Sequence, residues 1–327
     1  MVRFRTPWLC GVLLLALTAA PGRAADLDKY LPPDTETIVT FNVKQLLESA
    51  VVKKFGVLEH AKEALKNMDE VGDVLKDLGF DPFKDLDQVI VAGPGGNEKD
   101  KGLIIVHGKF DLEKFKKKAE EAAKDHADMV KVHKSGANLI YEVKVPADQE
   151  VTLFVTLASK DTILASPGKD YVVDALKLEG KKENAGLKNK QIQGLIEKMD
   201  AKQTLSLAMI GEAFAKAELP DEKIKAALAK IDAVSGGISV TDEVALDIGI
   251  TTKTAADAKE MSKTLNDGLN QILVVMGLAV GNEPGLASVM DFLKTIKATP
   301  KDKSVFIKAR IDADAIDKLH EKQKKDF

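Results

Sequence analysis

The chain has 327 residues, with 48 Lys and Arg against 51 Asp and Glu, and a formal net charge of −3 at pH 7. Its only cysteine is Cys10 and its only tryptophan is Trp8, and after residue 24 its only arginine is Arg310. Because arginine and aromatic side chains are so scarce, the composition argues against nucleic-acid binding, and one cysteine leaves no internal disulfide.

Residues 1–24 have the layout of a secretory signal peptide. Two arginines precede an apolar run over residues 8–20, which is shorter than the about 20 residues that a helix needs to cross a bilayer. Pro21 ends the run, and Ala24 has the small side chain that signal peptidase requires. We predict cleavage near Ala24, export to the periplasm or the outside, and a mature form that does not span a membrane. An uncleaved N-terminal anchor is the alternative.

Strand and helix patterns alternate through the first half of the chain. Runs rich in β-branched residues predict strands, and apolar residues at helical spacing predict helices. The predicted strands are 37–43, 89–93 and 102–110, followed by three more within 138–166, and the predicted helices are 58–79, 111–125 and 169–178.

The second half has a similar series of patterns. Its longest helical pattern ends in the apolar run ILVVMGLAV, residues 272–280. The predicted strands are 204–210, two within 233–252 and 304–311, and the predicted helices are 211–231, 254–280, 286–296 and 312–325.

The two halves share an order of elements. LDQV at 86–89 and IDAV at 231–234 each open the first strand of a pair, and each pair leads into a charged helix. This order predicts an α+β fold of two tandem split β-α-β-β-α-β units of the ferredoxin-like type, each an antiparallel sheet covered by helices. We place the first unit at 25–180, a linker with a helix at 181–203, and the second unit at 204–327. The alternative is one continuous sheet shared by both halves.

The segment VIVAGPGGNEKDKGLIIVHG, residues 89–108, places glycines and lysines between two apolar runs. A phosphate-binding loop needs Gly-Lys-Ser/Thr and a helix behind it, whereas this loop lacks that triplet and leads into a second strand-like run. Its charged tip is typical of an exposed turn. We predict a β-hairpin.

Histidine and nucleophile patterns give no catalytic motif. His126 and His133 lack the cysteines or the His-Glu-x-x-His spacing of a zinc site, and we expect both in exposed loops. His107 lies in a predicted strand, where we expect a half-buried, hydrogen-bonded side chain. A cavity that joined it to two carboxylates would favour an enzyme. We predict no catalytic residue, no metal site and no cofactor.

The main candidate for a contact surface is the apolar helical hairpin of residues 269–290. Two apolar helices flank the turn GNEPG, and the run ILVV leaves the first of them little polar face. Such a hairpin either docks on its own sheet, lines a cavity or makes an oligomer contact. The candidate ligand or contact residues are Leu269, Ile272, Leu273, Val275, Met276, Leu286, Val289 and Met290.

The opening LDKYLPPDTETIVTFNVKQLLESAVVKKF, residues 27–55, resembles that of secreted bacterial proteins of unknown function that are common in planctomycetes. In these proteins a Leu-Pro-x-Asp-Thr segment after the signal leads into a strand and a short helix. The resemblance implies repeated α+β units, and it implies no activity and no functional residue.

These patterns lead to two main hypotheses of function. The first is an exported, non-catalytic envelope protein that contacts a protein partner or a second copy of itself through sheet edges or the apolar hairpin. The second is a periplasmic carrier of an apolar ligand, comparable to a lipid or lipoprotein chaperone. A hydrolase is the least favoured, and no nucleic-acid partner is expected.

Overall fold

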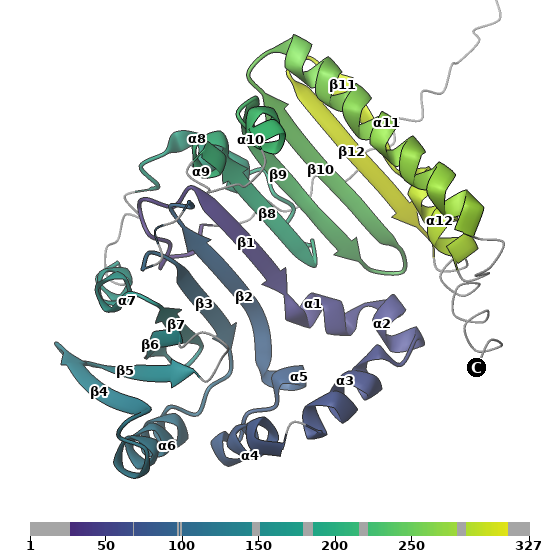
Figure 1. Ribbon diagram of the computed structural model, residues 1–327. Coiled ribbons are helices and arrows are strands. Elements are labelled where there is room, and N and C mark those ends of the chain that lie inside the picture. Colours follow the sequence, from purple (N-terminus) through teal and green to yellow (C-terminus); the bar gives the residue numbers. More distant parts are fainter. Residues whose placement is uncertain are drawn as a thin grey trace, which may run out of the picture.

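In the computed structural model the chain forms an α+β protein built on an antiparallel sheet, which confirms the predicted class (Figure 1). The predicted signal peptide, part of the predicted linker and nearly all of the last predicted helix lie outside the described residues. The structure describes residues 27–67, 69–96, 98, 100–145, 151–178, 186–215, 222–279 and 286–312.

The elements follow one another along the chain as strands with intervening helices. The strands are β1 (Thr37–Asn42), β2 (Leu86–Gly93), β3 (Leu103–Gly108), β4 (Val130–Ser135), β5 (Asn138–Val145), β6 (Val151–Ser159), β7 (Thr162–Ser166), β8 (Leu205–Ile210), β9 (Ile231–Val240), β10 (Val244–Thr252), β11 (Lys297–Lys301) and β12 (Ser304–Ile311). The helices are α1 (Val43–Glu48), α2 (Ala50–Lys54), α3 (Val57–Lys66), α4 (Asp69–Leu78), α5 (Pro82–Asp85), α6 (Leu112–Asp125), α7 (Lys169–Leu176), α8 (Lys190–Ile196), α9 (Gly211–Ala215), α10 (Glu222–Leu228), α11 (Ala255–Ala279) and α12 (Leu286–Thr295).

Both halves contribute to one sheet of 12 strands, in the order β11-β12-β10-β9-β8-β1-β2-β3-β7-β6-β5-β4. The expectation of two separate sheets is therefore wrong, and the shared sheet is the alternative that the structure has. Read outward from the central β1–β8 pair, the halves show the same order: β1, β2, β3, β7, β6 on one side and β8, β9, β10, β12, β11 on the other. The first half adds β5 and β4 at its edge.

The strand pairing differs from that of ferredoxin-like units. A split β-α-β-β-α-β unit uses its helices as crossovers over the face of the sheet. Here Asn42, the last residue of β1, is paired with Gln88 near the start of β2, so the chain leaves one strand and enters the next at the same end. Helices α1 to α5 therefore cap that end of the sheet, and β1 and β2 pair directly as antiparallel neighbours.

The register of the strands defines two faces, because directly paired residues point to the same side. Ala208 of β8 shares its face with Ser235, Gly249 and Phe306, which follow one another across β9, β10 and β12. Ile250 lies next to Gly249 along β10 and so points to the opposite face. We call the face of Ala208 the inner face and the face of Ile250 the outer face.

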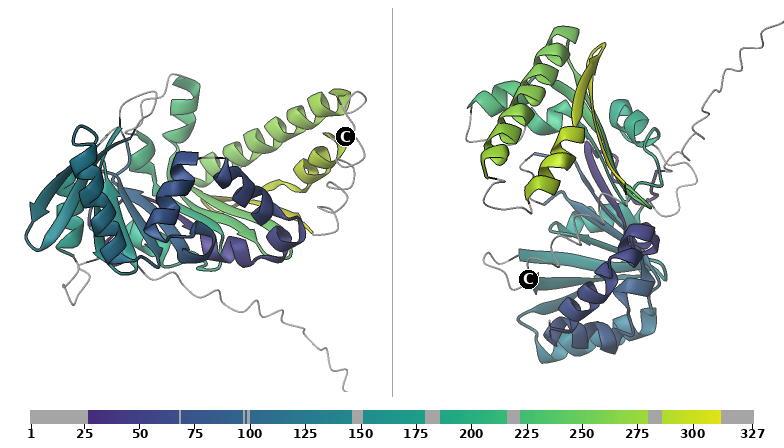
Figure 2. Two further views of the ribbon diagram at one scale, coloured as in Figure 1. Left: turned by 90° about the horizontal axis from the view of Figure 1, so that it is seen from below. Right: turned by 90° about the vertical axis from the view of Figure 1, so that its right-hand side faces the viewer.

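The main core lies on the inner face. Strands β1, β2, β3 and β8 contribute to it, and α7, α8 and residues 27–36, which we call the N-terminal segment, cover it. Its most deeply buried side chains are Tyr30, Leu103, Ile105, Ile140, Leu164, Val172 and Ile192, each 0% exposed. Helices α11 and α12 lie together over the C-terminal part of the sheet (Figure 2), and α11 packs on the outer face through Ala258 and Ile250.

The glycine-rich segment 89–108 forms the predicted β2–β3 hairpin. Gly95 and Gly96 both have a φ of 71°, a left-handed conformation that favours glycine. A Cβ atom at Gly95 would also lie 2.6 Å from the Cβ of Ala213 in α9. The glycines therefore allow a turn that packs closely on the second half of the chain.

Three local expectations differ from the structure. The helix predicted over 58–79 is two helices, α3 and α4, with Asn67 as the C-cap of the first. Strands β4 and β11 were not predicted, because KATPK in β11 is polar and VKVHKS in β4 lacks strong apolar alternation. Each gains its strand geometry from pairing with a neighbour, β5 or β12.

Candidate functional site

Helix α11 is pinned to the edge of the sheet by polar contacts along its first two thirds. The Ser262 hydroxyl donates to the main-chain oxygen of Ala298 at 2.9 Å, and the Asn266 side chain both donates to that oxygen at 2.9 Å and accepts from the Ala298 amide at 3.2 Å. Val305 and Ala258 complete a small buried cluster beneath the helix. These contacts fix which side of α11 faces the sheet.

A groove of about 310 Å³ runs along the flank of α11, between this helix, α10 and strands β9 and β10. We call it the α11 groove. Its apolar lining consists of Ala227, Leu228, Ile231, Ile250, Met261 and Leu265.

Charged side chains also line the α11 groove. Lys230 forms an ion pair with Glu260 at 2.8 Å and lies 3.9 Å from Asp257. The Glu260 carboxylate raises the pKa of Lys230, which therefore stays charged at neutral pH. These three groups leave one net negative charge, and the groove offers an apolar interior with a charged margin.

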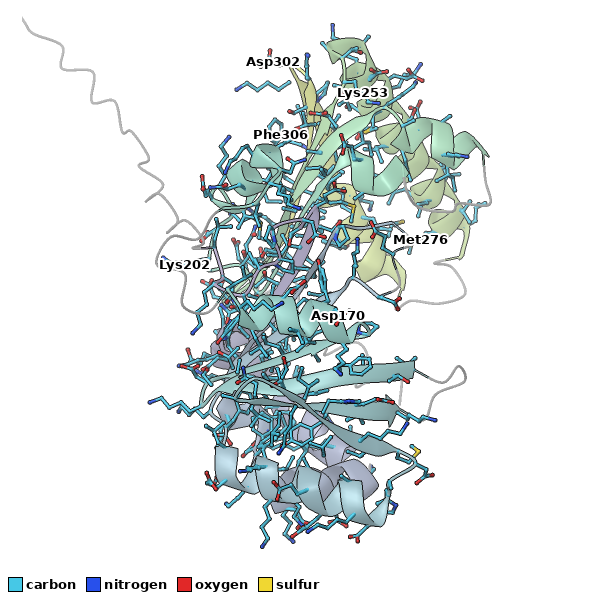
Figure 3. All side chains as sticks on the ribbon, turned by 90° about the vertical axis from the view of Figure 1, so that its left-hand side faces the viewer. Asp170, Lys202, Lys253, Met276, Asp302 and Phe306 are labelled. Atoms are coloured by element: carbon cyan, nitrogen blue, oxygen red, sulfur yellow. The ribbon has the colours of Figure 1, made fainter. Side chains whose placement is uncertain are left out.

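The predicted contact residues fall on this helix and its neighbour. Leu269, Leu273, Met276 and Met290 are half-buried, whereas Ile272 and Val275 are 49% and 66% exposed. Met276 lies near the C-terminal end of α11 (Figure 3).

Two predicted residues, Leu286 and Val289, lie in α12, and the structure does not describe their side chains. Two residues that were not predicted, Val274 and Leu278, are 67% and 79% exposed on α11. The C-terminal third of this helix is therefore apolar on its solvent side as well.

The lining of the α11 groove continues along the helix beyond the groove itself. Met261 and Leu265 line it, and positions three or four residues apart from these on the same side of α11 are Gly268, Ile272 and Val275. Nothing lies within 4 Å of the place that a Cβ atom of Gly268 would occupy. The groove thus opens onto an apolar stripe that reaches the exposed end of α11.

His107 confirms the expectation of a half-buried, hydrogen-bonded side chain. Its Nε2 lies 2.7 Å from the Asp28 carboxylate, and its Nδ1 lies 3.2 Å from the hydroxyl of Thr162, which in turn donates to Asp161 at 3.0 Å. The hydrogen bond to Asp28 raises the pKa of His107, against the opposing effect of burial.

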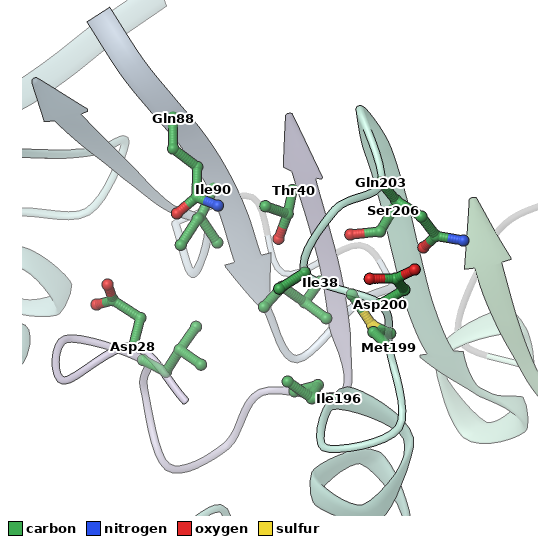
Figure 4. Close-up of a pocket in the computed structure, with 12 residues that line it drawn as sticks. Asp28, Ile38, Thr40, Gln88, Ile90, Ile196, Met199, Asp200, Gln203 and Ser206 are labelled. Carbon is green, nitrogen blue, oxygen red and sulfur yellow. The ribbon is translucent and has the colours of Figure 1, made fainter. Parts of the chain in front are cut away.

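This network resembles a nucleophile triad only in its residue types. Thr162 is 1% exposed, so its hydroxyl has no access to a substrate. Asp28 lines the pocket that is drawn in Figure 4, but His107 and Asp161 do not line that pocket. The network instead fastens the N-terminal segment to β3, together with a 3.0 Å hydrogen bond from the Tyr171 hydroxyl to Asp34.

The prediction that His133 lies in an exposed loop is wrong. His133 lies in strand β4 rather than in a loop, and its Nε2 is 2.7 Å from the Glu142 carboxylate of β5. That hydrogen bond lowers the pKa of Glu142. Within the described residues, no group of three or more His, Cys, Asp or Glu side chains has an arrangement that would hold a metal ion.

Comparison with known proteins finds no matching family model and no matching curated protein. Solved structures with a similar arrangement are crystal forms III, I and IV of TP0453, at 9%, 8% and 9% sequence identity and with TM-scores of 0.47, 0.43 and 0.45. The matches cover 90% of this chain in each case, and 98%, 96% and 96% of the other chain. Likeness at this level gives no basis for transferring a function.

Hydrophobicity along the helices bears on membrane crossing. In the part of the chain that the structure describes, no helix is both long enough and apolar enough to span a bilayer.

Proposed function

We propose that the protein is an exported, non-catalytic binding protein that holds an apolar chain in the α11 groove. The observation that carries the proposal is the continuous apolar lining from Met261 and Leu265 to Ile272 and Val275. A volume of about 310 Å³ falls at the lower end of the range for small-molecule sites, which is roughly 300–1,000 Å³. Export rests on the signal-peptide pattern of residues 1–24.

An elongated ligand fits this surface better than a compact one. The α11 groove lies between α10 and the N-terminal half of α11, and the apolar stripe beyond the groove is open to solvent at Ile272. An acyl chain would lie in the groove with its length along the helix, and its polar end would meet the charged margin at Lys230 or Glu260. Burial of the chain would contribute about 25 cal/mol for each Å² removed from water.

Sheet edges serve protein contacts less well in this fold. The edge strand β11 carries Pro300 and lysines at both ends, and the other edge strand, β4, carries Lys131 and Lys134. Proline and lysine on edge strands are the usual means by which proteins prevent strand addition. The exposed Val274 and Leu278 remain the best place for a protein partner to bind.

The first test is binding of an apolar probe. N-phenyl-1-naphthylamine should fluoresce on binding to the purified protein, and monolauroylglycerol should displace it with a Kd on the order of micromolar. Native mass spectrometry of protein exported by its own host should show a co-purifying lipid and a chain that begins after Ala24. Absence of probe binding, together with a ligand-free oligomer or a bound protein, would reject the carrier and favour the contact hypothesis.

Two glycines of α11 provide a matched pair of variants. Gly268→Leu would block the apolar stripe where it leaves the α11 groove. Gly277 lies nine residues further along, which places it on the opposite side of the helix. At both positions a Cβ atom would meet no atom within 4 Å apart from those of its own helix turn, so both positions accept a side chain. We expect Gly268→Leu to weaken displacement at least tenfold and Gly277→Leu to leave it unchanged. Equal effects of both would mean that the ligand lies elsewhere.

A further inference from the structure

A second pocket lies on the inner face of the sheet, where the two halves of the chain meet. Strands β1, β2 and β8 form its floor, the N-terminal segment bounds one side, and the connection after α8 bounds the other (Figure 4). We call it the seam pocket. The α11 groove lies on the outer face, and Lys202 beside the seam pocket and Met276 of α11 appear on opposite sides of the molecule in Figure 3. The two sites are therefore independent.

The seam pocket is small and amphipathic. Its volume is about 200 Å³. Because a water molecule occupies about 30 Å³ in the liquid, the pocket holds a ligand of about six or seven non-hydrogen atoms. Its apolar lining consists of Leu31, Ile38, Ile90, Ile196 and Met199.

The charge of the seam pocket is negative. Asp28 and Asp200 line it from opposite sides, and none of its described lining residues is basic (Figure 4). The Asp28 carboxylate lies 2.7 Å from Nε2 of His107, and the protonated form of His107 neutralises its charge. Asp200 accepts a hydrogen bond from the main-chain amide of Lys202 at 2.9 Å, and it forms no ion pair within the described residues. One carboxylate charge is thus left for a ligand to neutralise.

Polar side chains in the seam pocket lack partners. Ser206 is only 5% exposed and points toward the pocket, and its hydroxyl has no hydrogen-bond partner among the described residues (Figure 4). The same holds for the side chains of Thr40, which is directly paired with Ser206 on β1, and of Gln88 on β2. The side-chain oxygen of Gln203 is buried without a partner as well. An unpaired polar atom that is fully buried, as at Gln203, costs about 1–3 kcal/mol. The polar atoms of Ser206, Thr40 and Gln88 reach solvent in the pocket, so they are available to pair with a bound ligand.

We propose that the seam pocket binds a small aliphatic ammonium compound that also carries a hydroxyl group. The Asp200 carboxylate is the counter-ion of the ammonium group, the hydroxyls of Ser206 and Thr40 pair with the ligand hydroxyl, and the apolar side chains hold the short hydrocarbon between them. An anion is rejected because it would face two carboxylates.

The test uses probes of one size that differ only in their end groups. The four probes are 4-amino-1-butanol, butylamine, 1,4-butanediol and butyrate, and binding is followed through amide chemical shifts in two-dimensional NMR of the full mature chain. We expect 4-amino-1-butanol to bind with a Kd on the order of 0.1–1 mM, butylamine several-fold more weakly, the diol at least tenfold more weakly, and butyrate not at all. Shifts should concentrate on β1, β8 and residues 196–206.

Variants assign the site. Asp200→Asn keeps the hydrogen bond from the Lys202 amide and should weaken the binding of 4-amino-1-butanol at least tenfold. Ser206→Ala should weaken the binding of the same ligand about fivefold. Asp267→Asn is the matched control, since Asp267 is exposed on α11 of the outer face, and it should change nothing. Thermal unfolding of each variant shows whether it is folded.

Vesicles of an ethanolamine phospholipid form a separate arm, because that headgroup carries the same ammonium group. If the protein binds the vesicles but none of the small amines, and Asp200→Asn abolishes that binding, the seam pocket is supported and its ligand is a lipid headgroup. Three outcomes would overturn the proposal: no shift with any amine or vesicle, equal shifts with butyrate, or unchanged binding in folded Asp200→Asn.

Discussion

The two halves of the sheet share a strand order and differ in how tightly they are covered. Around β1, β2, β3 and β7, the main core on the inner face joins Tyr30, Ile105 and Ile192 from three different parts of the chain, all 0% exposed. Beneath α11, the buried cluster is limited to Ala258, Ala298 and Val305, and its other apolar members remain partly exposed. Similar topology therefore supports a dense core in one place and an open, ligand-sized groove in another.

The largest expected effect comes from replacing isoleucine by alanine in the main core and, for comparison, beneath α11. Ile105→Ala in the main core should lower the free energy of unfolding by about 3–5 kcal/mol, because a fully buried side chain leaves a cavity that cannot collapse. Ile307→Ala beneath α11 should cost about 1–2 kcal/mol, because Ile307 is only partly buried. Urea unfolding measures both, and equal losses would mean that the two ends of the sheet are packed alike.

The next effect concerns the fastening of the N-terminal segment. His107→Gln should cost about 1.5–3 kcal/mol near pH 6, the usual contribution of a hydrogen bond to a charged group. Because the folded pKa of His107 is raised, the stabilisation is fully present below the unfolded pKa of about 6.5 and is lost as pH rises through the higher folded value. The difference between wild type and variant should therefore shrink as pH rises above about 6.5.

A control histidine separates this effect from a general one. His60→Gln changes an exposed residue of α3 and should shift stability by less than about 0.5 kcal/mol across the same pH series. A wild-type advantage over His107→Gln that grew with pH would contradict the assigned role of Asp28 as its partner.

A smaller effect of opposite sign is expected within α11. Gly268→Ala should raise the free energy of unfolding by about 0.5–1 kcal/mol, because glycine is costly inside a helix and the added methyl group meets no atom within 4 Å. Thermal unfolding by circular dichroism measures the gain. A loss of stability would show that α11 depends on a close contact at this glycine.

The smallest effect on stability belongs to the exposed end of α11. Leu278→Ser should change the free energy of unfolding by less than about 0.5 kcal/mol, because this side chain is 79% exposed. The same change should reduce self-association in sedimentation velocity if the end of α11 is a contact surface for protein. A large loss of stability would mean that Leu278 is covered in solution.

Much of the local structure followed from the sequence. Strands with β-branched runs, such as β1, and the β2–β3 hairpin with its glycines were predictable, because both signals act between residues close in the chain. The edge strands β4 and β11 were not, since their geometry comes from pairing with β5 and β12.

The candidate sites divide in a similar way. The exposed apolar residues Ile272 and Val275 were predicted from their run in the sequence. The facing wall of the α11 groove, from Ala227 to Ile250, and the seam pocket around Asp200 and Ser206 carry no sequence motif. Nothing in the sequence pairs β8 with β1, and the seam pocket exists only because they are neighbours.

By itself, the sequence determined the α+β class, the positions of most strands and the apolar character of α11, because these depend on periodicity over a few residues. The tertiary structure alone decided that both halves share one sheet and that polar side chains far apart in the chain meet unpaired at its centre. Those outcomes depend on which strand edges pair, and long-range pairing is set by the packing of the whole chain.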